Sequence, residues 1–144
     1  MVICADTSFL FSLYANDVHT AKALAWTQTS RLPITVSEVT EFELGNALRF
    51  AEFRGLLARG HAAMFWAQYE KDCSGGRIIL EICNLASVIA ESKRLSATHT
   101  LTGGHRGFDI LHLGAALELG ADRFLTFDAN QKRLAQAEGL TVPI

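Results

Sequence analysis

The chain has 144 residues, a formal net charge of −2, 49% hydrophobic residues and only 19% charged residues. A chain of this length and apolar content can bury a core by itself, so we expect one domain over residues 1–144 with little disorder. The small negative net charge excludes a general nucleic-acid coat protein, because binding to a polyanion then needs a local basic patch or a bound cation.

The cysteines and the N-terminal stretch indicate the compartment. Cys4, Cys73 and Cys83 show no CxxC or cysteine–histidine spacing, so we interpret them as free thiols in a reducing compartment and predict no zinc site. The apolar stretch at the N-terminus lacks a basic region, is interrupted by Asp6 and is too short to cross a bilayer. The sequence therefore predicts a cytoplasmic protein without a membrane partner.

Short apolar runs alternate with stretches of helical periodicity along the whole chain, which is typical of strands connected by helices in a parallel sheet. Ser37 and Asn84 are predicted helix N-caps, and Pro143 places the last strand at a sheet edge. In chain order the predicted elements are a strand at 2–5, helices at 9–16 and 19–30, a strand at 33–36, helices at 38–54 and 60–72, a strand at 77–82, a helix at 85–97, a loop at 98–107, a helix at 107–119, a strand at 123–127, a helix at 128–138 and a strand at 140–144.

Four acidic residues fall where predicted strands end or helices begin. Asp6 and Asp128 directly follow strands, Glu43 lies early in the helix after the second strand, and Asp109 lies in the first turn of the helix before the fourth strand. In a parallel sheet all strands end, and all crossover helices begin, at one edge. We therefore expect the four side chains to lie together, although capping and the helix dipole would by themselves also favour Asp109 and Asp128.

Asp6 differs because it interrupts an apolar stretch in which Thr7 or Ser8 could cap the next helix without it. Several carboxylates in one half-buried cleft repel one another unless their pKa values rise or a cation lies between them. Ligand sets made only of oxygen prefer a hard ion such as Mg²⁺ or Mn²⁺, and such ions bind phosphate oxygens and activate water. The predicted chemistry is therefore metal-dependent hydrolysis of a phosphodiester.

The same residues resemble those of the PIN-domain ribonucleases, most closely the VapC toxins of bacterial type II toxin–antitoxin pairs. The similarity extends over essentially the whole chain and is carried by ADTSFL (5–10), EFELGNALR (41–49) and FDILHLGAALELGADRFLTFDANQKRLA (108–135). It implies an α/β protein with a three-layer α/β/α PIN-like fold around a parallel sheet of four to five strands. It also implies Mg²⁺-dependent cleavage of RNA, a homodimer, and a small VapB-like antitoxin that covers the active site.

The resemblance assigns the catalytic and metal-binding roles to Asp6, Glu43, Asp109 and Asp128. Glu38 and Glu41 precede Glu43, so the ligand on this helix is ambiguous, and the wording of the family motif favours Glu43. Further candidates for contacts to the substrate or support of the centre are Thr7, Ser8, His105, Arg106 and Asn130.

These further candidates have different physical reasons. His105 and Arg106 lie in a glycine-flanked loop, where the backbone can approach a phosphate closely and arginine can bind it with two hydrogen bonds. Asn130 stands where the family often has another acidic residue, and its amide oxygen can still ligate a metal or orient a water. His112 is interpreted as a histidine satisfied within its helix surroundings and not as a ligand. Arg49, Arg54 and Arg59 are candidates for a basic rim.

Three other functions remain open on the sequence. The chain could be a PIN-type nuclease of RNA processing without a toxin role. An aspartyl-phosphate hydrolase with Asp6 as nucleophile would have a second acid at the position of Ser8. A receiver-like signalling domain would have paired acids after the first strand and a lysine after a late strand, whereas Lys132 lies inside a predicted helix.

Overall fold

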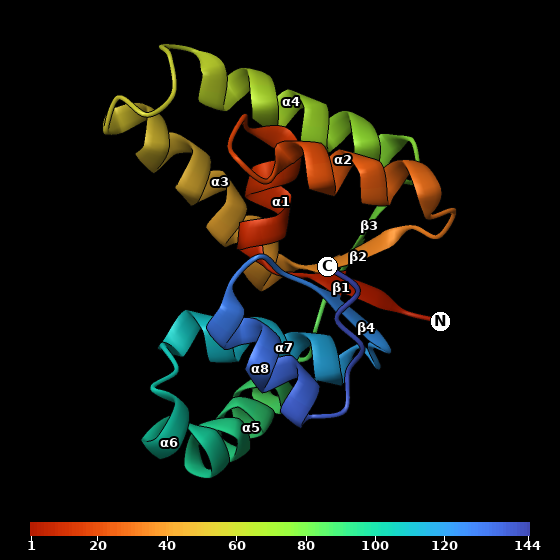
Figure 1. The fold of residues 1–144 in the computed structure, drawn as a ribbon, viewed down its shortest axis with the longest axis vertical. Helices are drawn as coiled ribbons and strands as arrows, with labels where there is room; N and C mark the ends of the chain where they lie inside the picture. The colour runs from red at the N-terminus through yellow and green to blue at the C-terminus, as the bar shows by residue number, and fades with distance from the viewer.

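The computed structural model describes residues 1–144 and contains a four-stranded parallel sheet between two layers of helices (Figure 1). The strand order is β3-β2-β1-β4. The three-layer α/β fold with a parallel sheet is therefore confirmed. The strands are β1 (Ile3–Ala5), β2 (Ile34–Ser37), β3 (Ile78–Glu81) and β4 (Arg123–Leu125).

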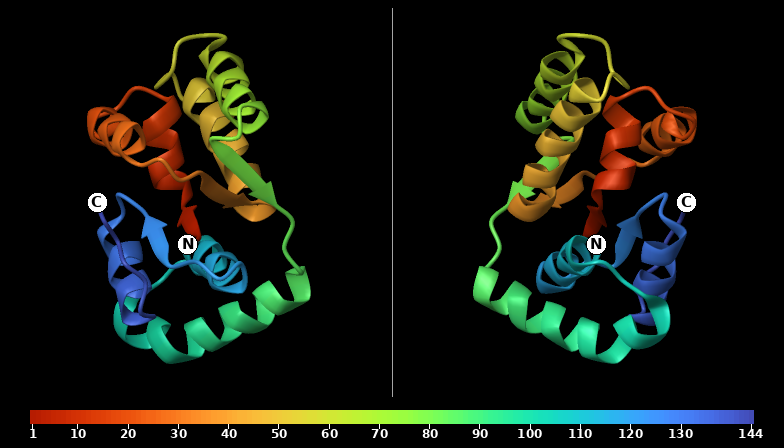
Figure 2. Two further views of the ribbon diagram at one scale, coloured as in Figure 1. Left: turned by 90° about the vertical axis from the view of Figure 1, so that its right-hand side faces the viewer. Right: turned by 90° about the vertical axis from the view of Figure 1, so that its left-hand side faces the viewer.

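The first half of the chain covers one face of the sheet and the second half covers the other (Figures 1 and 2). On the first face lie α1 (Thr7–Tyr14), α2 (Thr20–Thr29), α3 (Glu38–Phe53) and α4 (His61–Ser74). On the second face lie α5 (Leu85–Leu95), the π-helical turn η1 (Ser96–Thr100), α6 (Leu101–Gly103), α7 (Gly107–Glu118) and α8 (Ala129–Ala137). Ser37 and Asn84 cap α3 and α5 through their side chains, as predicted.

Alternation along the strands divides the core between the two faces. Ile3 and Ala5 of β1 pack with the buried side chains of α1 and α3, whereas Cys4 between them packs with those of α7 and α8. In β4, Phe124 and Leu125 divide in the same way. Because successive strand side chains point to opposite faces, a strand buried on both sides is apolar throughout.

The order of the strands reverses next to β1. The chain passes from β1 to β2 and β3 through helices on one face, and then returns through α5–α7 to place β4 on the other side of β1. In open parallel sheets such a reversal leaves a crevice at the carboxyl ends of the two neighbouring strands. The residues that follow β1 and β4 are therefore placed where this fold accommodates a ligand.

Two predicted elements differ from the structure. The segment 140–144 is not a fifth strand: Thr141 forms a single bridge with Arg123, and Pro143 has no N–H with which to extend the ladder. The segment 98–107, predicted as a loop from its threonines and glycines, is helical as far as Gly103. Thr98 contributes because its hydroxyl donates to the carbonyl of Arg94 at 2.8 Å, and Gly104 ends the helix with a φ of 65°.

None of the helices combines the length and the apolar character that spanning a membrane requires.

Candidate functional site

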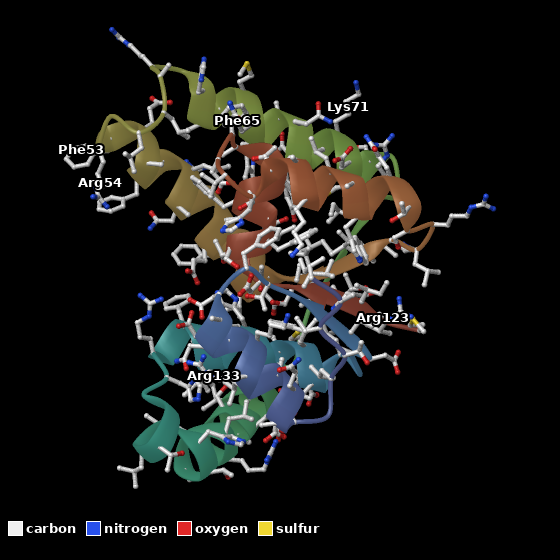
Figure 3. All side chains as sticks on the ribbon, in the orientation of Figure 1. Phe53, Arg54, Phe65, Lys71, Arg123 and Arg133 are labelled. Atoms are coloured by element: carbon white, nitrogen blue, oxygen red, sulfur yellow. The ribbon has the colours of Figure 1, made fainter.

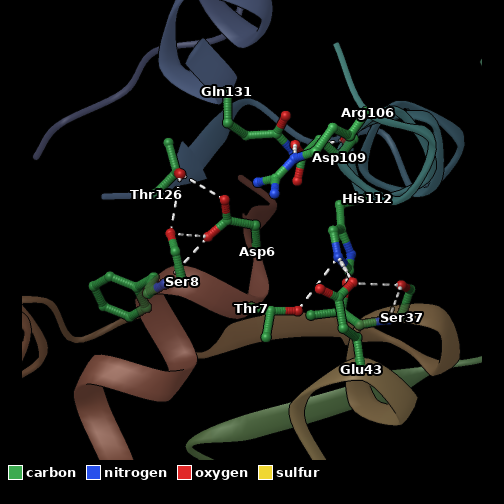
Figure 4. Close-up of polar contacts among 12 residues, drawn as sticks. Asp6, Thr7, Ser8, Ser37, Glu43, Arg106, Asp109, His112, Thr126 and Gln131 are labelled. Carbon is green, nitrogen blue, oxygen red and sulfur yellow. Dashed lines mark hydrogen bonds and ion pairs between the residues drawn. The ribbon is translucent and has the colours of Figure 1, made fainter. Parts of the chain in front are cut away.

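A cavity of about 420 Å³ lies at the carboxyl ends of β1 and β4, and all four predicted carboxylates line it. Asp6 reaches it from the end of β1, Glu43 from α3, Asp109 from the start of α7 and Asp128 from the start of α8. Figure 4 shows three of them, Asp6, Glu43 and Asp109, with their hydrogen-bond partners. Residues up to 122 positions apart in the chain thus share one cavity.

Asp6 is 4% exposed and is the N-cap of α1, where its Oδ1 accepts from the backbone N–H of Phe9 at 3.1 Å. Ser8 Oγ donates to the same oxygen at 2.6 Å, and Thr126 Oγ1 donates to Oδ2. Burial raises the pKa of Asp6, while these three hydrogen bonds lower it. The suggestion that Thr7 or Ser8 could serve as the cap is wrong, because α1 begins at Thr7 and Asp6 holds its first turn.

Glu43 is bound by a histidine that sequence reasoning did not connect with it. His112 is 3% exposed, and its Nε2 contacts the Glu43 carboxylate and lies 3.3 Å from Thr7 Oγ1. Its other ring nitrogen, Nδ1, lies 2.8 Å from Thr40 Oγ1. The histidine is therefore satisfied inside the protein, as predicted, but it also fixes one of the candidate ligands.

The structure separates Glu43 from the two acids that precede it in α3. Glu41 Oε2 accepts from the Tyr69 hydroxyl at 2.8 Å, and both Glu38 oxygens accept from the backbone N–H of Cys83. Neither Glu38 nor Glu41 lines the cavity. Two residues along a helix turn a side chain by about 200°, so Glu41 and Glu43 face opposite ways.

Asp109 and Asp128 meet at the junction of α7 and α8. Asp109 Oδ2 accepts from Arg106 Nε at 3.2 Å, and Asp128 Oδ1 accepts from the backbone N–H of Gln131 at 2.8 Å. The buried Gln131 side chain donates to the Asp109 carbonyl at 2.7 Å and joins the two helix starts. The two ends of the helix–strand unit from 109 to 128 therefore come together, as the topology predicts.

The predicted accessory residues divide into two groups. Thr7, Ser8 and Arg106 line the cavity. His105 and Asn130 do not: they lie 3.1 Å apart, with the Asn130 amide beside His105 Nδ1. Burial lowers the pKa of His105. The structure therefore brings only the first group to the carboxylates.

Arg106 is the only arginine or lysine that lines the cavity, and its side chain is 80% exposed. Arg49, Arg54 and Arg59, the candidates for a basic rim, do not line the cavity. Arg49 lies over the Trp66 ring, and Arg54 lies over Phe50 at the outer end of α3, far from the sheet (Figure 3). Arg106 is thus the one arginine or lysine beside the four carboxylates.

The carboxylates of the cavity offer oxygen donors to a divalent ion, although the side chains do not converge on one point. As the side chains lie, no group of three or more histidine, cysteine, aspartate or glutamate residues is close enough to hold a metal. However, Glu43, Asp109 and Asp128 each use only one carboxylate oxygen in a hydrogen bond, which leaves the other oxygen of each free. This set of oxygen donors fits a hard cation such as Mg²⁺ or Mn²⁺.

No local sequence pattern indicated that three further residues, Thr126, His19 and Phe127, lie next to the carboxylates. Thr126 precedes Asp128 by two positions and donates to Asp6. His19 and Phe127 line the cavity and stack on each other. His19 follows Asp17, to which its backbone N–H donates, and sequence alone indicated only the start of a helix.

Comparison with known proteins gives the family and the fold. The sequence model of the PIN domain matches residues 3–137. A search of curated proteins found no match. Among solved structures, VapC20 of Mycobacterium tuberculosis, described as a toxin that cleaves the sarcin–ricin loop, is similar with a TM-score of 0.71, 16% identity and 96% coverage of both chains.

Two complexes also contain similar chains. FitAcB from Neisseria gonorrhoeae gives a TM-score of 0.66 at 19% identity, covering 98% of this chain and 96% of that one. DNA-bound VapBC from Salmonella typhimurium gives a TM-score of 0.60 at 14% identity, covering 99% and 96%. At these identities the similarity shows a shared fold.

Proposed function

The chain belongs to the PIN-domain family, whose members are nucleases, and from this premise we propose that it is a Mg²⁺- or Mn²⁺-dependent endoribonuclease that hydrolyses RNA phosphodiester bonds. One observation carries the proposal: Asp6, Glu43, Asp109 and Asp128 line one cavity at the point where the strand order reverses. Four acids around a cavity would repel a polyanion, and a divalent ion resolves this conflict.

Each group has a part in the proposed mechanism. Asp6, Glu43, Asp109 and Asp128 would hold the ion, which when bound supplies a water activated for attack and charge to offset that of the phosphate. Ser8 and Thr126 keep the buried Asp6 carboxylate in place. Arg106 is exposed and sits beside Asp109, so its guanidinium can turn from that carboxylate to a substrate phosphate.

The proposal is tested with two glutamates of the same helix. We expect the purified protein to cleave RNA only with Mg²⁺ or Mn²⁺, and Glu43→Gln to lower the rate at least about 100-fold, because it removes a charge from the metal site. Glu41→Gln is the matched control, since Glu41 bonds Tyr69 outside the cavity and its loss should leave cleavage unchanged. Asp6→Asn and Asp109→Asn should also abolish cleavage while circular dichroism stays native. Metal-independent cleavage, or cleavage unaffected by these variants, would reject the mechanism.

We also propose that the nuclease is the toxin of a VapBC-type pair, acts in the cytoplasm, forms a homodimer and is covered by a small antitoxin protein. Support comes from the fold shared with VapC20 and with the chains of the FitAcB and VapBC complexes. Phe42 and Phe108, which precede Glu43 and Asp109 in the chain, are exposed, and their ring centroids lie 6.5 Å apart, so they offer apolar area to such a partner.

Expression in a bacterial host tests the toxin role. We expect the intact protein to arrest growth, the Asp109→Asn variant not to, and a small gene adjacent to this one to restore growth when expressed with it. Light scattering of the purified protein then gives its oligomeric state. A protein that cleaves RNA in vitro but does not arrest growth would favour the alternative, a PIN nuclease of RNA processing.

A further inference from the structure

Three aromatic rings stack from the core to the edge of the carboxylate cavity. Phe9 is fully buried, and Phe127 stacks on it with a centroid distance of 5.6 Å and an interplanar angle of 22°. His19 stacks on Phe127 at 4.5 Å and 8°, nearly parallel. His19 is exposed, and both it and Phe127 line the cavity that contains the carboxylates. The stack therefore ends in a flat, solvent-facing ring beside Asp6 and Asp128.

The inner part of this stack is tied directly to the carboxylate centre. The backbone N–H of Phe127 donates to Ser8 Oγ at 3.0 Å, and Ser8 Oγ in turn donates to Asp6. Asp128 is the next residue after Phe127 and caps α8. This chain of bonds fixes the backbone of Phe127, from which the ring projects, relative to Asp6.

The loop between α1 and α2 independently holds the backbone of the residue that carries the outer ring. The backbone N–H of His19 donates to Asp17 Oδ1, and Ser12 Oγ donates to Asp17 Oδ2, both at 2.8 Å. Thr20 Oγ1 donates to the carbonyl of Ser12 at 2.6 Å and closes the loop onto α1. A ring that projects from this fixed backbone and already stacks on Phe127 loses little conformational entropy when a flat ligand stacks on its other face.

We propose that the outer face of His19 is a stacking site for the base of an unpaired RNA nucleotide that lies next to the phosphodiester cleaved. The inference rests on the proposed ribonuclease function and adds to it a base-binding residue. Proteins hold single strands by stacking bases on aromatic and histidine rings, and such contacts tolerate any base because each has a π-face. In a duplex the bases already stack on one another and cannot reach the ring.

The alternative is that His19 only covers Phe127, and two substitutions separate these roles. His19→Leu still covers Phe127 but has no π-face, whereas His19→Phe keeps a flat ring and removes the ring nitrogens. Val18→Ala is the matched control, because Val18 is 91% exposed on the same loop and does not line the cavity. All are made in an Asp109→Asn background, so that the RNA stays intact during binding measurements.

The experiment measures binding of fluorescein-labelled single-stranded RNA by fluorescence anisotropy, using a series of oligonucleotides in which one nucleotide at a time lacks its base. We expect His19→Leu to weaken binding of the complete strand about 5- to 100-fold, and His19→Phe and Val18→Ala to bind as the parent does. At one position of the series, removal of the base should weaken binding to the parent but not to His19→Leu. The same sequence as a duplex should bind the parent more weakly than the single strand does.

Such coupling between one base and one side chain is a property of direct contact, which a merely structural role would not produce. Three results would each overturn the inference. Removal of a base could weaken binding to His19→Leu as much as binding to the parent at every position. His19→Leu could bind the complete strand as tightly as the parent does, or the parent could show no measurable RNA binding. The proposed function is judged separately, by metal-dependent cleavage of RNA by the unsubstituted protein. Cleavage without coupling at His19 refutes the stacking site alone.

Discussion

Two of the acidic residues at the cavity serve the fold and the site at the same time. Asp6 and Asp128 are the N-caps of α1 and α8, whereas Asp109 lies inside the first turn of α7. Capping, which the sequence suggested for Asp109 and Asp128, therefore holds for Asp128 but not for Asp109, and it also applies to Asp6. Capping contributes about 1 kcal/mol, but burying an ionised carboxylate to 4% exposure costs more than that unless several donors compensate it. Ser8 and Thr126 donate two further hydrogen bonds to the Asp6 carboxylate. Capping alone does not require these donors, whereas a buried carboxylate that acts in a site does.

Local spacing in the sequence predicted which acidic side chains line the cavity, but not which side chains form hydrogen bonds with them. The sequence left the ligand on α3 ambiguous and only the wording of the family motif favoured Glu43, whereas the structure places Glu43 and not Glu41 at the cavity. The contact between His112 and Glu43 joins residues 69 positions apart, and the bond from Thr126 to Asp6 spans 120. No local pattern encodes such pairs, since they depend on how two faces of the sheet meet.

The hydrogen-bonded series from Thr40 through His112 to Glu43 leads to a prediction about metal affinity. If the histidine fixes the glutamate, then Thr40→Val and His112→Ala should each raise the Mn²⁺ concentration for half-saturation about 10-fold, the usual cost of losing a residue that orients a metal ligand. Electron paramagnetic resonance of free Mn²⁺ measures this without catalysis.

The matched control for this series is Tyr69→Phe. Tyr69 donates to Glu41 on the same helix, outside the cavity, so its hydroxyl should not matter for Mn²⁺. Thermal unfolding of each variant identifies loss through misfolding, and Thr40→Val changes no side-chain volume appreciably. If folded Thr40→Val and His112→Ala bind Mn²⁺ as tightly as the parent, the histidine has no positioning role.

At the scale of elements, strands and most helices followed from sequence because their apolar patterns are local. The wrong predictions concern segments whose local sequence favours one conformation while tertiary contacts favour another. Residues 98–103 carry turn-forming types but continue the helical path of α5 through a π-turn, in which His99 reaches Glu138 near the end of α8 at 2.6 Å. A contact with a distant element thus overrides the local preference.

The packing of α5 on α7 is another element-scale feature that sequence did not reveal. Gly114 lies on the buried face of α7, and a Cβ there would come 2.5 Å from Ser92 Oγ and 3.3 Å from the Val88 carbonyl. A glycine inside a helix costs about 1 kcal/mol in propensity, so its presence here reflects the close approach of α5. This contact sets how closely α5 packs on α7.

For the whole molecule, the connectivity determines where chemistry can occur. The reversal of strand order beside β1 brings the first and last quarters of the chain together, with the backbone N–H of Asp6 donating to the carbonyl of Leu125 at 3.1 Å. Asp6 and Asp128 therefore become neighbours through the fold and not through sequence. The parallel topology could be predicted, and with it the edge, because alternating strands and helices permit few arrangements.

Glu138, which directly follows α8, links the last helix of the second layer to α5 and η1, which begin this layer. Its carboxylate binds Arg94 Nη2 of α5 and His99 Nε2 of η1, both at 2.6 Å. The hydrogen bond from Arg94 lowers the pKa of Glu138, with a smaller contribution from His99. A carboxyl whose pKa is lowered by folding stabilises the protein above its unfolded pKa of about 4.3, and this contribution disappears as the pH falls through the folded value.

Glu138→Gln should therefore lower the free energy of unfolding by about 1 kcal/mol at pH 7, and by progressively less below about pH 4.5, where the parent carboxyl also loses its charge. Urea unfolding between pH 3 and pH 8 measures the difference. Glu118→Gln is the matched control, because the side chain of Glu118 is exposed on α7 and accepts no hydrogen bond. The free energy of unfolding of this variant should equal that of the parent at every pH. A difference that stays constant with pH, or grows as the pH falls, would show that the ion pairs of Glu138 do not hold the two ends of this layer together.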